Sequence, residues 1–138
     1  VHAMAKRMAQ AGADVILGAH PNVVQGVERI STVRSDGLTY ETVVCYSLGC
    51  LLTDARDSEN TAGMAVRLEM TYDPAVRRVW PGALEVTPLY IARQREDSGI
   101  VYRVVNAQDK QALEKLTLSE QAAAAQAAER VKNATQEE

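Results

Sequence analysis

Hydrophobic and polar positions at the start of the chain follow a helical period and then give way to a continuous apolar run. Met4, Met8 and Ala11 stand at three- and four-residue steps with polar residues between them, which predicts an amphipathic helix. Gly12 follows in the usual position of a glycine that ends a helix. The run Asp14–Leu17 is short and nearly all apolar, and it predicts a strand of a parallel sheet that is buried on both faces.

Strand patterns continue through the middle of the chain. Residues 23–30 and 39–48 each predict a strand, and Asp36-Gly37 between them is a strong turn signal. The two strands are therefore expected to form a hairpin. Residues 64–71 alternate apolar with polar side chains, which predicts a strand with one face in water.

The remaining segments combine short apolar runs with turn residues and end in an alanine-rich tail. Residues 76–92 predict one or two strands, in which Pro81 and Pro88 are expected to lie at sheet edges or bulges. Residues 100–105 predict a last short strand. Residues 107–134 are rich in Ala, Gln, Glu and Lys, which predicts two helices, or one broken helix, packed on the same domain.

Composition and charge exclude several classes of partner. The 138 residues are 46% hydrophobic, as in an ordinary globular domain. The 15 basic and 18 acidic residues are dispersed and leave a net charge of −3, so nucleic acid is not expected as a partner. No apolar stretch approaches the ~20 residues that span a bilayer, so no transmembrane segment is expected in this chain.

The beginning of the chain predicts that it is a fragment of a longer protein. Val1 to Gln10 already reads as a helix, without the capping residue that usually opens one. Any export signal or membrane anchor is expected upstream of Val1. Cys45 and Cys50 match no zinc or redox spacing and are expected to be two separate thiols.

Two motifs in the first part of the chain carry a family resemblance. Residues 11–28 contain Gly-Ala-Asp, an apolar strand, Gly-Ala-His-Pro-Asn and Val-Val-Gln-Gly, and residues 45–51 read Cys-Tyr-Ser-Leu-Gly-Cys-Leu. In this order they resemble CapA-type proteins of poly-γ-glutamate capsule synthesis, a branch of the calcineurin-like metallophosphoesterase superfamily. The corresponding family motifs are Gly-x-His-Pro-His with Val-x-Gln-Gly, and Tyr-Ser-Leu-Gly-Asn-Phe. The resemblance covers roughly residues 1–105.

The resemblance implies an α/β fold that is one half of a larger unit. Residues 1–105 would form the C-terminal half of a metallophosphoesterase-like α/β sandwich, with sheets flanked by helices, and residues 106–138 a C-terminal helical extension. Such a half is incomplete without an N-terminal half. Because the strand Asp14–Leu17 reads as buried on both faces, its neighbours are expected to come from residues outside this chain or from a second chain.

The resemblance also implies a metal site on the loop after this strand. Two imidazoles one residue apart at a strand end can each ligate one ion of a two-metal centre that clamps phosphoryl oxygens. His20 matches the first histidine of the family pair and is the expected metal ligand and catalytic residue. Asn22 replaces the second, and its amide oxygen is a poorer ligand, so a site for divalent Mn, Fe, Zn or Mg is expected to be weakened. The other family ligands have no counterpart here, and the chain alone is expected to be inactive.

Further residues of the two motifs are candidates for substrate binding, namely Asn22, Gln25, Ser47 and Cys50. Structural interpretations stay open for each: His20 in a vestigial loop, Asn22 as a turn residue, Gln25 on the polar side of a strand and Cys50 as a packed thiol. Ser47 lacks a Gly-x-Ser-x-Gly elbow and a histidine partner, so it is not expected to be a nucleophile.

By resemblance, the whole protein would act in bacterial capsule or poly-γ-glutamate synthesis as a metal-dependent, phosphoesterase-like hydrolase of the cell envelope. Its implied location is extracytoplasmic, membrane-associated through an upstream segment, and its implied partners are its N-terminal half or a companion chain and the capsule synthesis machinery. The alternative is a metal-free scaffolding or binding module of that machinery, which the departures at Asn22 and Cys50 favour. A third hypothesis is an unrelated α/β domain whose loop only mimics the family.

Overall fold

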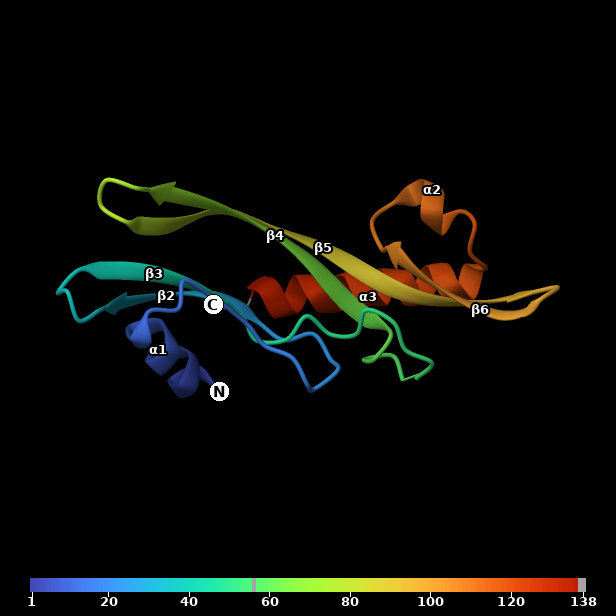
Figure 1. The fold of residues 1–138 in the computed structure, drawn as a ribbon. Helices are drawn as coiled ribbons and strands as arrows, with labels where there is room; N and C mark the ends of the chain where they lie inside the picture. Colours follow the sequence, from blue (N-terminus) through green and yellow to red (C-terminus); the bar gives the residue numbers. More distant parts are fainter. Residues whose placement is uncertain (56, 137–138) are drawn as a thin grey trace.

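The described part of the chain forms an α/β fold with two separate three-stranded sheets. The computed structural model describes residues 1–55 and 57–136. The first sheet has the strand order β1-β3-β2 and the second the order β4-β5-β6, as Figure 1 shows. The elements are α1 (His2–Ala11), β1 (Val15–Leu17), β2 (Val27–Val33), β3 (Thr39–Cys45), β4 (Ala62–Asp73), β5 (Arg78–Glu96), β6 (Gly99–Asn106), α2 (Lys110–Leu113) and α3 (Leu118–Gln136). The predicted α/β class is confirmed.

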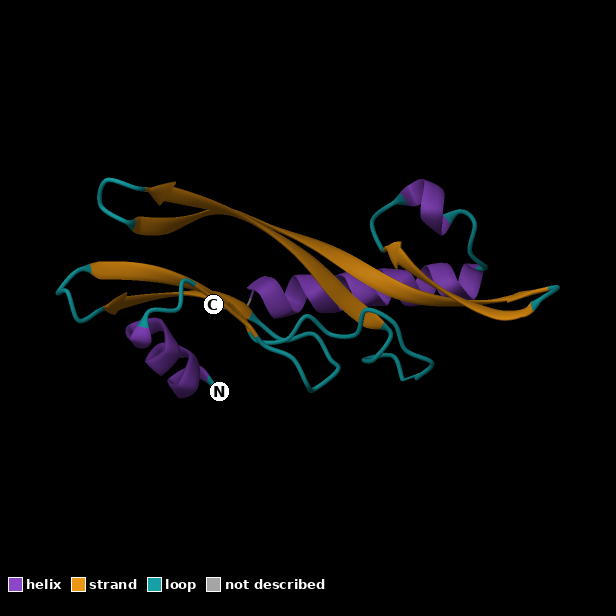
Figure 2. Cartoon of the chain, in the orientation of Figure 1, coloured by secondary structure: helices purple, strands orange, loops and turns teal. Residues whose placement is uncertain are grey.

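The first sheet contains the predicted helix, parallel strand and hairpin. Helix α1 ends at Gly12, whose φ of 119° places it in the left-handed region that glycine adopts without strain. β1 pairs with β3 in parallel, and β2 pairs with β3 antiparallel. The hairpin turn falls between Val33 and Thr39, as the Asp-Gly pair predicts. Figure 2 shows α1 beside this sheet.

The buried face of α1 differs from the prediction. Ala5 and Ala9 are buried, whereas Met4 and Met8 are 68% and 44% exposed. Alanine lets the helix backbone approach β2 and β3 closely, so the methionine stripe lies to one side of the contact. β1 is likewise at the edge of its sheet, pairs only with β3 among the described residues, and leaves Leu17 59% exposed. The described residues therefore do not bury β1 on both faces. The expectation that the neighbours of this strand come from outside the chain is wrong for one of them, because β3 of the same chain pairs with β1.

The second sheet is a long ribbon of β4 and β5 with β6 added along part of it. β5 runs as one strand from Arg78 to Glu96. Pro81 lies at the register shift between β4 and β5, as predicted. Pro88 pairs with Met64 of β4, but the ladder with β6 begins only at Leu89. The missing N–H of Pro88 therefore falls where β6 no longer pairs.

Helices α2 and α3 confirm the prediction of two helices in the alanine-rich tail, and α3 packs along β5 and β4. Tyr90 in β5 donates a hydrogen bond from its hydroxyl to Glu120 in α3. The core between the helices and this sheet contains Ala62, Tyr90, Ala92, Ala107, Leu116, Ala124 and Ala127. None of the helices in the described residues has both the length and the apolar character needed to cross a membrane.

Candidate functional site

The loop that carries His20 leaves the carboxyl end of β1, where sequence analysis placed it. The N–H of Gly18 donates to the carbonyl of Cys45 over 2.7 Å. A Cβ atom on Gly18 would lie only 2.0 Å from the carbonyl oxygen of Tyr46. Because real side chains do not approach a backbone so closely, this contact between the two motifs requires glycine.

The loop itself has an unusual backbone. His20 has a φ of 109° and Asn22 a φ of 59°, and both residues are exposed. Asparagine tolerates the left-handed region, but histidine at 109° lies outside the region that non-glycine residues commonly adopt. Within residues 1–55 and 57–136, the His20 side chain makes no hydrogen bond or ion pair. Local side-chain contacts therefore do not explain why the chain holds His20 in this conformation.

The two sequence motifs lie side by side through backbone contacts. The N–H of Gln25 donates to the carbonyl of Ser47 over 3.0 Å, and Val24 forms an isolated bridge with Leu48. The thiol of Cys50 donates to the backbone carbonyl of Asn22 over 3.4 Å. The predicted residues Asn22, Gln25, Ser47 and Cys50 are thus brought into one loop cluster.

Ser47 and Cys50 have different surroundings within this cluster. Ser47 is only 1% exposed, and its Oγ accepts a hydrogen bond from the N–H of Gly49 over 3.3 Å. Cys45 and Cys50 are separate thiols, as predicted. A buried serine that holds a neighbouring turn has a structural role in this chain, and its contact with a substrate stays a prediction.

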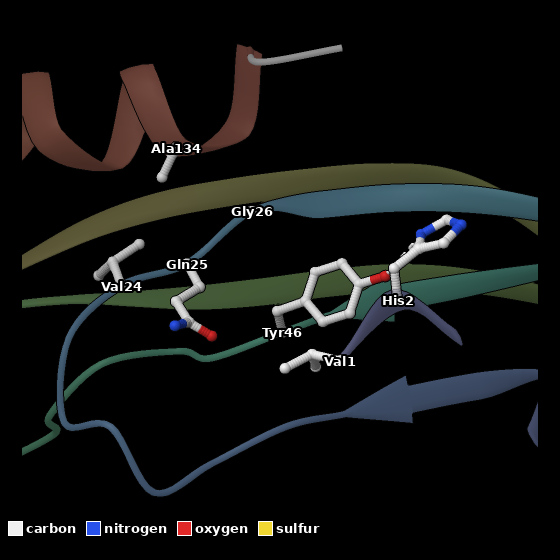
Figure 3. Close-up of a pocket in the computed structure, with 7 residues that line it drawn as sticks. All are labelled: Val1, His2, Val24, Gln25, Gly26, Tyr46 and Ala134. Carbon is white, nitrogen blue, oxygen red and sulfur yellow. Dashed lines mark hydrogen bonds between the residues drawn. The ribbon is translucent and has the colours of Figure 1, made fainter. Parts of the chain in front are cut away.

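A cavity beside the cluster has a volume of about 450 Å³. Figure 3 shows Gln25 and Tyr46 at this cavity, with the ring of His2 near the tyrosine hydroxyl. The cavity is lined by Val1, His2, Val24, Gln25, Gly26, Tyr46 and Ala134. Gln25 is the one predicted site residue among them, so the described residues do not gather all the candidates around this cavity.

A hydrogen-bonded network at this cavity was not predicted from the sequence. The Nδ1 atom of His2 lies 2.8 Å from Oε1 of Glu28 and 3.2 Å from the hydroxyl of Tyr46, which donates to the same carboxylate oxygen. Burial, followed by this hydrogen bond to Glu28, raises the pKa of Tyr46 to about 12. The network joins α1, β2 and the segment after β3. Tyr46 and Glu28 belong to the two motifs, but His2 carried no sequence signal.

A second cavity, of about 180 Å³, begins directly after Asn22. It is lined by Val23, Val24, Glu59, Ala62 and Arg130. The Arg130 guanidinium donates to Oγ of Ser58 over 2.9 Å and lies 3.5 Å from Oε1 of Glu59. Helix α3 thereby contributes a cation close to the candidate loop, which sequence analysis missed because α3 is distant in the chain.

The donors of the described residues do not by themselves make a metal centre. No three His, Cys, Asp or Glu side chains in this part of the chain lie close enough together to hold one ion. The His20 imidazole is one nitrogen ligand, and the amide of Asn22 is a weak oxygen donor. A metal at this loop would need most of its ligands from residues other than the described ones.

Comparison with known proteins gives one family match. Residues 1–55 match the model of the family described as bacterial capsule synthesis protein PGA_cap. Searches of curated proteins and of solved structures find no significant match. The matched residues contain β1, the His20 loop, the hairpin and both motifs. This part of the chain is therefore similar to bacterial capsule synthesis proteins, and the match supports a role in capsule synthesis.

Proposed function

We propose that this chain is part of a bacterial capsule synthesis protein and that its His20 loop forms one wall of a metal-dependent, hydrolase-type site. The observation that carries the proposal is the strained backbone of His20, with a φ of 109°, at the carboxyl end of β1 and within the residues that match the family. Strain of this kind costs of order 1–3 kcal/mol and is concentrated at functional sites.

In this proposal the residues of the chain have separate tasks. His20 offers its exposed imidazole as one metal ligand, and the remaining ligands come from an N-terminal half or a companion chain. A bound divalent metal would supply a Lewis acid and an activated water. Gln25 contacts the substrate from the larger cavity. Arg130 faces an anionic group, phosphoryl or carboxylate, from the smaller one.

The proposed setting of the reaction is the cell envelope. The substrate centre is a phosphoryl or acyl-type group of the capsule polymer or its precursors. The protein would lie outside the cytoplasm, attached to the membrane through a segment that precedes Val1, and would work with the capsule synthesis machinery. The match over residues 1–55 supports the capsule role, and location and partners rest on the resemblance.

A metal-free scaffolding or binding module is the second candidate. Asn22 has a φ of 59°, which asparagine adopts readily as a turn residue. Its backbone carbonyl accepts a hydrogen bond from the thiol of Cys50. Cys50 is the residue that stands where the family motif has asparagine. Both departures from the motif therefore have a structural explanation that involves no metal.

Metal analysis of the complete protein separates the two candidates. The protein that contains this chain is purified at neutral pH, and its divalent metal content is measured for the wild type, for His20→Ala and for His2→Ala. The two substitutions each remove one imidazole, but His2 lies on α1. We expect about one or more ions per chain in the wild type and in His2→Ala, and a clear loss in His20→Ala. A wild type with less than about one ion per chain and no change in His20→Ala would favour the scaffold.

A further inference from the structure

The smaller cavity joins the family-matched loop to a cation from the far end of the chain. Val23 and Val24 follow the His20 loop, whereas Arg130 belongs to α3. The cavity volume is about 180 Å³, which is room for about six water molecules at the ~30 Å³ that each occupies in the liquid. A cavity of this size accepts one small group of a ligand, such as a carboxylate or a phosphoryl group.

One edge of the Arg130 guanidinium is fixed, and the other is held loosely. Its Nη2 atom donates a hydrogen bond to Oγ of Ser58 over 2.9 Å. Its Nη1 atom lies 3.5 Å from Oε1 of Glu59, which is longer than the ~2.7–2.9 Å of a charge-assisted hydrogen bond. Nη1 therefore keeps the capacity to form a shorter hydrogen bond with another anion.

The turn that precedes β4 fixes the backbone of Ser58 and Glu59. The N–H groups of Asn60 and Thr61 both donate to the carbonyl of Asp57, over 3.0 and 3.3 Å. The hydroxyl of Thr61, a residue that is only 6% exposed, donates to the carbonyl of Ser58 over 3.2 Å. The Glu59 side chain, in contrast, is 68% exposed. It can therefore rotate into solvent while the turn keeps its shape.

The charges at this cavity oppose each other. Glu59 and Arg130 are the charged members of the five lining residues, and the other three are apolar. An anion in the cavity is attracted by Arg130 and repelled by Glu59. An ion pair between partly exposed side chains contributes little to stability. The free energy needed to separate Glu59 from Arg130 is therefore small, and a ligand anion can supply it.

We propose that Glu59 is an intramolecular gate on Arg130, whose carboxylate occupies the guanidinium in the free chain and is displaced by an anionic group of the ligand. The ligand then binds Nη1, while Ser58 keeps the guanidinium in position. Neutral groups are rejected, because they cannot compensate the guanidinium charge that the carboxylate leaves. This inference rests on the task proposed above for Arg130 and adds its regulation.

The test measures the binding of inorganic phosphate, which requires neither a metal nor a known substrate. Nuclear magnetic resonance of the isotope-labelled full chain follows the Nε–H of Arg130 and the backbone amide of Ser58 as phosphate is added at constant ionic strength. We expect weak, saturable binding to the wild type. Glu59→Gln keeps the shape of the side chain without its charge and should bind about three- to tenfold more tightly. Arg130→Gln should lose the binding.

The pair of Arg67 and Glu85 provides a matched control. Its two side chains are also 3.5 Å apart, but neither residue lines this cavity. Glu85→Gln removes the same charge from the chain and should bind phosphate as the wild type does. An equal gain in Glu85→Gln and Glu59→Gln would overturn the gate, because net charge alone would then explain it.

Two further results would overturn the proposal. Equal phosphate affinities of the wild type and Glu59→Gln would exclude the gate and leave the anion site at Arg130 intact. Signals of Arg130 and Ser58 that do not respond to phosphate in either protein would exclude both the gate and the anion site. Neither result bears on the metal content of the wild type and His20→Ala, so failure of the gate is distinguishable from failure of the proposed metal site.

Discussion

The two sheets of this chain are stabilised in different ways. The second sheet packs its long strands against α3, with Tyr90 and Ala92 almost completely buried. The first sheet buries a much smaller apolar cluster under α1, centred on Ile30 and Val44. Yet the first sheet and its loops contain both motifs and nearly all of the family match. The candidate site therefore lies in the part of the chain with the smaller core of its own.

Polar and backbone contacts replace apolar burial in the first sheet. Arg34 donates to the carbonyls of Ala9 and Ala13 and to Asp14, and Thr42 donates to Ala13 over 2.6 Å. Such contacts are directional, so they fix the end of α1 and the start of β1 without covering the sheet. The position of the His20 loop therefore depends on close backbone contacts rather than on a large apolar core.

The largest expected effect comes from breaking the contact between the two motifs. Gly18→Ala places a Cβ 2.0 Å from the carbonyl oxygen of Tyr46, so the backbone has to shift. We expect the free energy of unfolding to fall by about 3 kcal/mol, as in overpacked cores. Urea denaturation of the wild type and the variant measures this change in the free energy of unfolding.

Gly26→Ala is the matched control for this substitution. Its Cβ would lie 3.4 Å from the carbonyl oxygen of Ala134, an ordinary contact. The free energy of unfolding should change by less than about 1 kcal/mol. Equal losses in the two variants would show that the contact at Gly18 does not limit the position of the loop.

A smaller effect is expected from removing the polar contacts of the first sheet. The Arg34 side chain is 13% exposed, and Arg34→Ala leaves two carbonyls and the Asp14 carboxylate without this donor. We expect a loss of about 2 kcal/mol in the free energy of unfolding. Arg67→Ala in the second sheet removes a pair with Glu85 in which both side chains are about two-thirds or more exposed, and should cost less than about 0.5 kcal/mol. Similar losses in both variants would contradict the proposed difference between the sheets.

The smallest effect concerns the network at the larger cavity. The pKa of Tyr46 is raised from 10.0 to about 12 in the folded chain, so between these values the folded state holds a proton that the unfolded state has lost. The raised pKa of Tyr46 therefore stabilises the folded state fully below about pH 10, and this contribution is lost as the pH rises toward about 12. Tyr46→Phe should remove the part of the ultraviolet absorbance change that occurs near pH 12 in the wild type. Glu28→Gln should lower the pKa of Tyr46 only in part, because burial is the larger cause. Identical absorbance titrations of the wild type and Tyr46→Phe above about pH 10 would contradict the geometry of the network.

Local sequence signals predicted the order and type of the elements in both sheets, although the strand expected over residues 23–30 begins only at Val27 and extends to Val33. Gly12 ended α1, the Asp-Gly pair turned the β2–β3 hairpin, and the alternation over residues 64–71 became β4. These features depend on residues close together in the chain, where torsional preferences and side-chain period act directly. The loop cluster was not predicted, because only the parallel pairing of β1 with β3 brings the two motif loops together.

The order and type of the elements, the α/β class and the position of His20 after a short apolar strand follow from local patterns in the chain. Long-range packing, in contrast, places Ala5 and Ala9 rather than the methionines against the sheet, puts β1 at an edge, and brings Arg130 and His2 beside the motif residues. The physical reason is that burial and side-chain partnership depend on how distant segments pack. An apolar period shows that a face needs covering, but it does not say which segment covers it.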